Sequence, residues 1–129
     1  MPNTIGLGSI LMLAAVAIGA FGAHGLQDRL QEVDARATDW YHTATLYMFV
    51  HALGILILGL LKELKRSKVI RAIDFCSWCF FLGIIFFSGS LFAMAVSGAR
   101  SLGMITPLGG ILFLLGWAQF FRVGMNLKQ

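Results

Sequence analysis

One histidine of this sequence occupies a position where a titratable side chain could do chemistry inside an apolar segment. His51 stands about midway along an uncharged run over 40–61. On a helix, Tyr47 lies one turn away on the same face. An ionisable group at this depth of a membrane span marks a functional site or a polar contact between helices. His51 and Tyr47 are therefore the first candidate site residues.

Serines at a similar depth offer partners for this pair. The midpoint of the third uncharged run, 75–99, places Ser88 and Ser90 level with His51. We predict a buried polar cluster in which His51 and Tyr47 meet one of these serines. Two roles stay open for the cluster: a fastening between helices, or a polar centre for transport or proton relay.

The other reactive residue types form no recognisable catalytic or metal site. Cys76 and Cys79 have no second cysteine pair or nearby histidine to complete a zinc site, so we interpret them as small packing residues. His24 and His42 share one level, but His51 lies about 13 Å deeper along the helix. The sequence also lacks an intramembrane acid pair and a nucleophile with a positioned base. We predict no enzyme, no cofactor and no metal site.

Uncharged runs predict the elements that hold these residues. Hydrophobic residues make up 58% of the 129 residues and charged residues 12%, which is outside the balance of a soluble domain. Asp, Glu, Lys and Arg are absent from 1–27, 40–61, 75–99 and 101–121. Each run exceeds the roughly 20 residues that cross a hydrocarbon core. We predict an all-α membrane protein, a four-transmembrane-helix bundle forming one integral membrane domain over 1–129, with spans at about 4–24, 41–61, 74–98 and 103–123.

Basic residues predict the orientation of these spans. Most of them fall on the side that holds both termini: Lys62, Lys65, Arg66, Lys68, Arg71, Arg122 and Lys128. The positive-inside rule then places both termini in the cytoplasm, with the chain in a bacterial inner membrane. The first apolar run is longer than a signal peptide needs and lacks a basic start, so we expect it to be retained. The partner implied by the basic charge is the lipid bilayer, and no nucleic acid is expected.

The first outer loop is predicted to contain a short amphipathic helix. Its apolar residues follow helical spacing: Leu26, Leu30, Val33, Ala37 and Trp40. The residues on the other side of such a helix are polar or charged: Asp28, Gln31, Glu32, Arg36 and Asp39. We expect this helix to lie on the outer surface of the membrane, with a solvated connector as the alternative.

Small residues on the first span predict a helix-packing groove. Gly8, Ala15, Gly19 and Gly22 advance by seven, four and three residues, which keeps them within a narrow arc of a helix. Small residues let helix backbones approach closely in lipid. We predict a close-packed helix pair or an oligomer seam on this face.

Two polar features fall at the outer end. His24, Tyr41 and His42 are expected to be solvated or interfacial, with a polar cluster among them as the alternative. Thr106 and Pro107 predict the start of the fourth helix, with Thr106 as N-cap and a partly irregular segment over 98–105 before it. A proline kink inside a longer helix is the competing interpretation.

Four ordered motifs carry a family resemblance. They are "GAFGAHGL" at the end of the first span, "YHTATLYMFVHALGIL" in the second, "FSGSLF" in the third, and "TPLGG" with "FLLGW" in the fourth. With these motifs the chain resembles the small membrane-protein family called domain of unknown function 423, bacterial relatives of transmembrane protein 256. The resemblance implies a four-span inner-membrane protein and supplies no catalytic or ligand residues to carry over.

The sequence as a whole favours a structural role. We predict a scaffold or accessory subunit that packs through glycine-rich faces, either as a homo-oligomer or within a larger membrane complex. The alternative is a minimal oligomeric transporter or channel with its polar centre at His51. A monomer of four helices has little room for a pathway, so this alternative requires oligomerisation.

Overall fold

The computed structural model describes residues 1, 3–64 and 69–127, and within these ranges the chain forms helices and no strand. Four rods are long and apolar enough to cross a membrane. They are α1 (Thr4–His24), α3 (Ala37–Leu64), the continuous rod of α4 (Ile70–Gly83), η1 (Ile84–Ser88) and α5 (Gly89–Ser97), and α6 (Thr106–Asn126). Two short helices, α2 (Gln27–Val33) and η2 (Arg100–Met104), lie in the connections. The predicted all-α fold with four candidate spans and a short helix in the first loop is confirmed.

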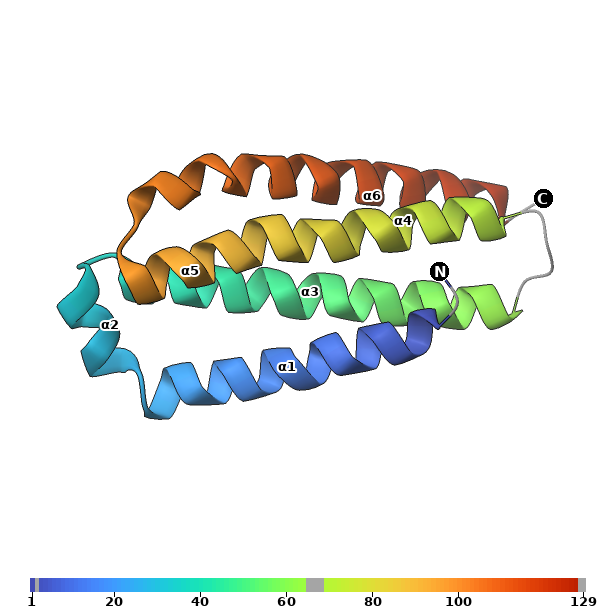
Figure 1. Cartoon of the computed structure of the whole chain (residues 1–129). Helices are drawn as coiled ribbons and strands as arrows, with labels where there is room; N and C mark the ends of the chain where they lie inside the picture. Colours follow the sequence, from blue (N-terminus) through green and yellow to red (C-terminus); the bar gives the residue numbers. More distant parts are fainter. Residues whose placement is uncertain (2, 65–68, 128–129) are drawn as a thin grey trace.

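The rods lie side by side with α3 and the α4–η1–α5 rod in the middle (Figure 1). α1 packs along α3, and α6 packs along α4 and η1, so α1 and α6 flank the two central rods. α2 closes one end of the bundle, which we call the α2 end. Met1, the last turn of α3, the first turn of α4 and the C-terminal end of α6 lie together at the opposite end, called here the Met1 end (Figure 1).

The contact between α1 and α3 depends on close backbone approach at two glycines. A Cβ at Gly8 would lie 2.9 Å from the backbone nitrogen of Leu56, and a Cβ at Gly59 would lie 2.9 Å from the backbone nitrogen of Ile5. Backbone atoms cannot rotate away as a flexible side chain can. Larger residues at either position would therefore push α1 away from α3.

The core lies between the two central rods and their flanking helices. Its largest fully buried side chains come from α3, α4 and α6: Phe80, Ile55, Leu58, Ile73 and Val123. The lipid-facing sides of the rods carry exposed apolar residues instead, as expected where hydrocarbon replaces water as the solvent. Packing, not sequestration from water, holds the rods together.

The predicted amphipathic stripe does not form one helix, because the chain breaks after Val33. Asp34 has extended backbone angles, and its carboxylate accepts a hydrogen bond from the backbone N–H of Arg36 at 2.9 Å. This local turn competes with helix continuation. α3 then begins at Ala37, which is fully buried together with Leu30 of α2. The stripe is therefore split between two helices that pack on the same small core.

The third rod contains one turn of π-helix, η1, at Ile84–Ser88. Sequence reasoning treated this span as a uniform α-helix. A π turn inserts a residue into the helical repeat and shifts which residues face each neighbour beyond it. Such turns are frequent at functional sites, and this one contacts both α3 and α6.

Four of the basic residues that predict the orientation lie outside the described ranges: Lys65, Arg66, Lys68 and Lys128. Of the same set, Lys62 and Arg71 flank the α3–α4 connection at the Met1 end, and Arg122 lies in the last turns of α6.

Candidate functional site around His51

His51 lies in the middle of α3 inside a cluster of aromatic rings. Its side chain is buried, and its ring stacks on Phe113 of α6 with centroids 3.5 Å apart and 11° between the planes. Phe80 of α4 meets the His51 ring edge-on at 5.2 Å, and Trp117 of α6 does so at 5.9 Å. Three rods therefore meet at one histidine.

Both ring nitrogens of His51 have hydrogen-bond partners. Nδ1 lies 2.7 Å from the backbone carbonyl oxygen of Tyr47, and Nε2 accepts the indole N–H of Trp117 at 3.0 Å. A carbonyl oxygen only accepts and an indole N–H only donates, so Nδ1 carries the proton and Nε2 carries none. These partners assign His51 as the neutral Nδ1–H tautomer. The histidine thereby fastens α3 to α6 through Trp117.

A cavity of about 460 Å³ opens beside this cluster between α3, η1 and α6. Its lining combines aromatic and aliphatic residues: Tyr47, His51, Phe87, Pro107, Gly110, Ile111, Phe113, Leu114 and Trp117. Tyr47 stacks on Phe87 with centroids 4.4 Å apart. Of the predicted cluster, the structure thus brings Tyr47 and His51 together on one cavity wall.

The serine partners predicted for His51 are wrong. The Ser88 hydroxyl donates to the backbone carbonyl of Ala44 at 2.8 Å, seven residues along α3 from His51. The Ser90 hydroxyl donates to the carbonyl of Phe87 and lies 2.6 Å from the hydroxyl of Thr106. Seven helical residues correspond to about 10 Å, so the serines lie nearer the α2 end than His51.

The cause of this error is the use of charges to mark the ends of the third span. The rod begins at Ile70, before Asp74, and ends at Ser97, before Arg100. Its true midpoint therefore lies several residues before the midpoint of the uncharged run. Phe80 is the residue of this rod that contacts His51.

The residues that sequence reasoning missed are Phe113 and Trp117. They are four residues apart, so on α6 they share the face turned toward α3. Two signals point to them: Phe113 lies near the midpoint of the uncharged run 101–121, and Trp117 has an N–H that needs a partner at a depth without water. The same depth argument that selected His51, applied to the fourth run, points to Phe113, and Trp117 follows one turn later on the same face.

The predicted small-residue face of α1 lies against α3. Gly8, Ala15 and Gly22 are buried. A Cβ at Gly19 would lie 3.3 Å from the Thr45 methyl group, so this position is less crowded. The four positions therefore sit within the bundle, along the contact with α3, and do not form a free seam.

His24, Tyr41 and His42 do not form a cluster. His24 and His42 are exposed at the α2 end. Tyr41 is not interfacial as predicted, because it is 5% exposed and its hydroxyl donates to the backbone carbonyl of Ile18. The missing side chain of Gly22 leaves the space that the Tyr41 ring fills.

α6 begins at Thr106 with Pro107 in its first turn, after the 3₁₀ turn η2. The predicted N-cap role of Thr106 is wrong, because Ile105 occupies the cap and no side chain hydrogen bond caps this helix. The Thr106 hydroxyl instead faces Ser90 of α5. It thus connects the start of α6 to the third rod.

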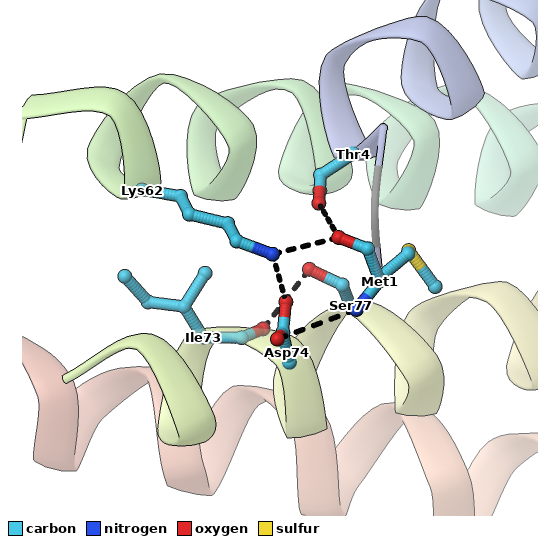
Figure 2. Close-up of polar contacts among 6 residues, drawn as sticks. All are labelled: Met1, Thr4, Lys62, Ile73, Asp74 and Ser77. Atoms are coloured by element: carbon cyan, nitrogen blue, oxygen red, sulfur yellow. Dashed lines mark hydrogen bonds and ion pairs between the residues drawn. The ribbon is translucent and has the colours of Figure 1, made fainter. Parts of the chain in front are cut away.

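A second polar cluster joins three rods at the Met1 end (Figure 2). The Lys62 ammonium donates to Asp74 Oδ1 and to the backbone carbonyl of Met1, each at 2.6 Å. The Met1 amino group lies 3.3 Å from Asp74 Oδ2. Sequence reasoning used Lys62 and Asp74 as span boundaries, and Lys62 also for the orientation of the spans, without pairing the two. Their opposite charges at the two ends of one connection are the signal that predicts the pair.

An ion pair joins the connections at the α2 end. Arg100 donates to both carboxylate oxygens of Asp34, and its guanidinium lies 5.7 Å from the ring centre of Trp40. The hydrogen bond from the Arg36 backbone, followed by that from Arg100, lowers the pKa of Asp34 below its usual value of 3.8. The pair fixes the η2 connection to the turn between α2 and α3.

The stability of this end is expected to fall in acid. A carboxyl whose pKa is lowered by folding stabilises the folded state above its unfolded pKa, and the contribution disappears as pH falls through the folded value. Thermal unfolding in detergent at pH 6 and pH 3 should therefore show a smaller acid destabilisation in Asp34→Asn than in the wild type. Asp28→Asn, on exposed α2, is the matched control. Equal acid destabilisation of Asp34→Asn and wild type contradicts the assignment.

Comparison with known proteins shows that this sequence is similar to those of membrane proteins. The family model described as protein of unknown function (DUF423) matches residues 18–110. A UPF0382 membrane protein of Staphylococcus epidermidis is 44% identical over 111 residues, covering 86% of this chain and 85% of the relative. UPF0382 membrane protein YwdK of Bacillus subtilis is 39% identical over 111 residues, covering 86% of each chain. A UPF0382 membrane protein of Haemophilus influenzae is 41% identical over 102 residues, covering 79% and 77%. No solved structure matches the chain.

Proposed function

We propose that this chain, which belongs to the DUF423 family of membrane proteins, acts as a scaffold or accessory subunit of the membrane and not as an enzyme. In this role the bundle packs against copies of itself or against a larger membrane complex. The flanking helices α1 and α6 supply the contact surfaces. In each of these two rods, only 17% of an 18-residue apolar stretch is buried inside the bundle. The corresponding share is 50% for α3 and for the third rod.

The observation that carries this proposal is the closed hydrogen bonding of His51. A relay histidine passes protons to and from hydrogen-bond partners that can take up or release them, but the partners of His51 are a backbone carbonyl, which only accepts, and an indole N–H, which only donates. Its contacts suit a fastening that holds α6, and therefore the outer face of α6, in one position against α3. Such interhelical contacts in membranes contribute about 1–2 kcal/mol.

Two substitutions of His51 separate the structural role from proton chemistry. Glutamine retains an acceptor near the position of Nε2 and alanine retains none, while neither can exchange a proton as imidazole does. We expect His51→Ala to lower the free energy of unfolding by about 1–2 kcal/mol and to release partners during mild-detergent extraction. We expect His51→Gln to retain more of both properties than His51→Ala. Native mass measurement of the extracted complex and unfolding in mixed micelles provide the readouts.

The alternative function is a minimal oligomeric transporter with its polar centre at His51, and the cavity beside His51 is the observation that favours it. Under this alternative, His51→Gln in liposomes leaves assembly intact and abolishes flux of protons or solute. Wild-type liposomes that show no flux above protein-free liposomes, together with loss of partners in His51→Ala, support the accessory role. Flux that depends on His51 while assembly is unchanged overturns it.

We further propose that the Met1 end faces the cytoplasm and that the chain lies in the bacterial inner membrane. Lys62, Arg71 and Arg122 lie near the Met1 end, whereas Arg29, Arg36 and Arg100 lie near the α2 end. In the sequence, four further basic residues follow the last described residues of α3 and α6: Lys65, Arg66, Lys68 and Lys128. By the positive-inside rule this distribution supports the orientation. Cysteine labelling at exposed positions of α2 in intact cells tests it.

A further inference from the structure

The cavity between α3, η1 and α6 has the size and the walls of a small-molecule site. Its volume of about 460 Å³ is within the range of ligand sites. The rings of Tyr47, Phe87, Phe113 and Trp117 line it, and Gly110 leaves one side open. A Cβ at Gly110 would approach Phe87 no closer than 3.9 Å, so the hollow is not filled by the protein itself.

The walls of the cavity are fixed before any ligand enters. The indole of Trp117 is held by its hydrogen bond to His51, and the His51 ring is stacked on Phe113. Tyr47 stacks on Phe87 of the π turn. Because these rings are held in place, a flat occupant finds preformed surfaces and binding orders few side chains.

The cavity offers one free hydrogen-bond donor among its described residues. Three polar side chains line it, and two of them, His51 and Trp117, satisfy each other. The hydroxyl of Tyr47 has no hydrogen-bond partner within the described part of the chain, whereas the hydroxyl of Tyr41, the other tyrosine, donates to Ile18. Tyr47 lies one turn from the middle of α3, where hydrocarbon surrounds a membrane span and water is absent. A hydroxyl there is stabilised by an acceptor on an occupant.

The rim of the cavity determines how an occupant enters and what charge it has. Ile111, Leu114 and Trp117 of α6 are 54%, 72% and 41% exposed, so the rim faces the apolar solvent. No residue that lines the cavity carries a charge at neutral pH, given the neutral His51. An occupant therefore arrives from the bilayer, is uncharged, and extends its apolar part along α6.

We infer that this cavity binds an uncharged lipid with a flat ring and a carbonyl acceptor, the chemistry of a membrane quinone. The ring lies against the aromatic walls, the Tyr47 hydroxyl donates to the carbonyl oxygen, and the apolar tail leaves along Ile111 and Leu114. The inference concerns binding alone, and it goes beyond the scaffold role, which the assembly of the His51 variants tests separately.

Quenching of Trp117 emission by a quinone tests this inference. The full chain is prepared in detergent with Trp40→Phe and Trp78→Phe, which leaves Trp117 as the emitting residue. The probe is para-benzoquinone carrying a decyl tail. We expect saturable quenching, and we expect Tyr47→Phe to weaken the apparent affinity about fivefold to tenfold by removing one hydrogen bond.

Three controls make the result specific. Tyr41→Phe removes a hydroxyl outside the cavity and should leave the affinity unchanged. Gly110→Leu fills the hollow and should abolish saturable quenching. Decylbenzene, which has the tail and ring but no carbonyl, should relieve the quenching by the quinone only weakly when both are present at equal concentration. Helical circular dichroism checks the folding of each variant. Gly110→Val replaces Gly110→Leu if the leucine variant does not fold.

Several outcomes overturn the inference. Quenching that rises linearly with quinone concentration and does not saturate indicates random collisions between the quinone and Trp117 in the micelle, without a binding site. If Tyr47→Phe binds the quinone as tightly as the parent protein does, the Tyr47 hydroxyl does not donate to the quinone carbonyl, and the assigned ligand class loses its support. Relief of about half of the quenching by decylbenzene at equal concentration would mean that it binds as tightly as the quinone, and that the cavity holds any apolar chain, such as a lipid tail.

Discussion

Replacing Gly109 by alanine is expected to destabilise the protein by about 3 kcal/mol, at the upper end of the usual cost of overpacking. A Cβ at this position would lie 2.7 Å from the Cβ of Phe87 and 2.8 Å from its Cα. Phe87 belongs to the π turn of η1, whose backbone is fixed by its own helix. The added methyl group therefore forces α6 away from the third rod along their whole contact.

The neighbouring glycine is the matched control for this substitution. A Cβ at Gly110 has its nearest neighbours at 3.9 and 4.0 Å, which is ordinary contact. Gly110→Ala should therefore leave the free energy of unfolding unchanged, or raise it by up to about 1 kcal/mol through helix propensity. Both variants are measured by titrating SDS into mixed micelles and following helical circular dichroism. Similar stabilities of the two variants would contradict the close contact of α6 with η1.

These adjacent glycines illustrate what the sequence can predict about the fold. Uncharged runs predict the four rods, because each long apolar segment must satisfy its backbone hydrogen bonds as a helix within lipid. The sequence also marks Gly109 and Gly110 as small residues at the start of the fourth rod. The sequence does not show which of the two glycines lies against the backbone of the third rod, because that depends on the rotation of α6 about its axis.

Relative depth is the property of the site that sequence reasoning predicted least well. His51 was selected correctly as a residue of the bundle interior, since α3 is nearly centred on its uncharged run. The third rod is not centred in this way, because Ile70 starts it before Asp74 and the π turn changes its repeat. Ser88 consequently lies level with Ala44, and Phe80 takes the place beside His51.

The partners of charged residues were missed for a related reason. From the sequence, Lys62, Asp74 and Arg100 serve only to mark the ends of uncharged runs or to set the orientation of the spans. In the structure each makes a specific ion pair that joins segments far apart in the chain. A position at the end of a span explains why a charged residue is tolerated there. Which opposite charge it pairs with depends on how the rods and their connections pack against one another.

Phe80 occupies the junction where three rods meet, and its replacement by alanine is expected to have the other large effect. The ring is fully buried. It lies between two glycines, since a Cβ at Gly54 of α3 or at Gly116 of α6 would come within 3.0 Å of its atoms. It also contacts the rings of His51 and Trp117, with centroids 5.2 and 4.8 Å away. Both glycines thus make room for this one ring.

Phe80→Ala should lower the free energy of unfolding by about 3–5 kcal/mol, because the two flanking glycines have no side chains that could fill the cavity. Phe75→Ala is the matched control, since Phe75 lies on the same helix but is 50% exposed, and lipid can occupy the vacated space. The removal of Phe80 should also change the emission of Trp117 in the Trp40→Phe, Trp78→Phe background, because one wall of its environment is lost. Equal destabilisation by the two alanine substitutions would show that the three rods do not meet at this ring, and the fastening by His51 would then lack its support.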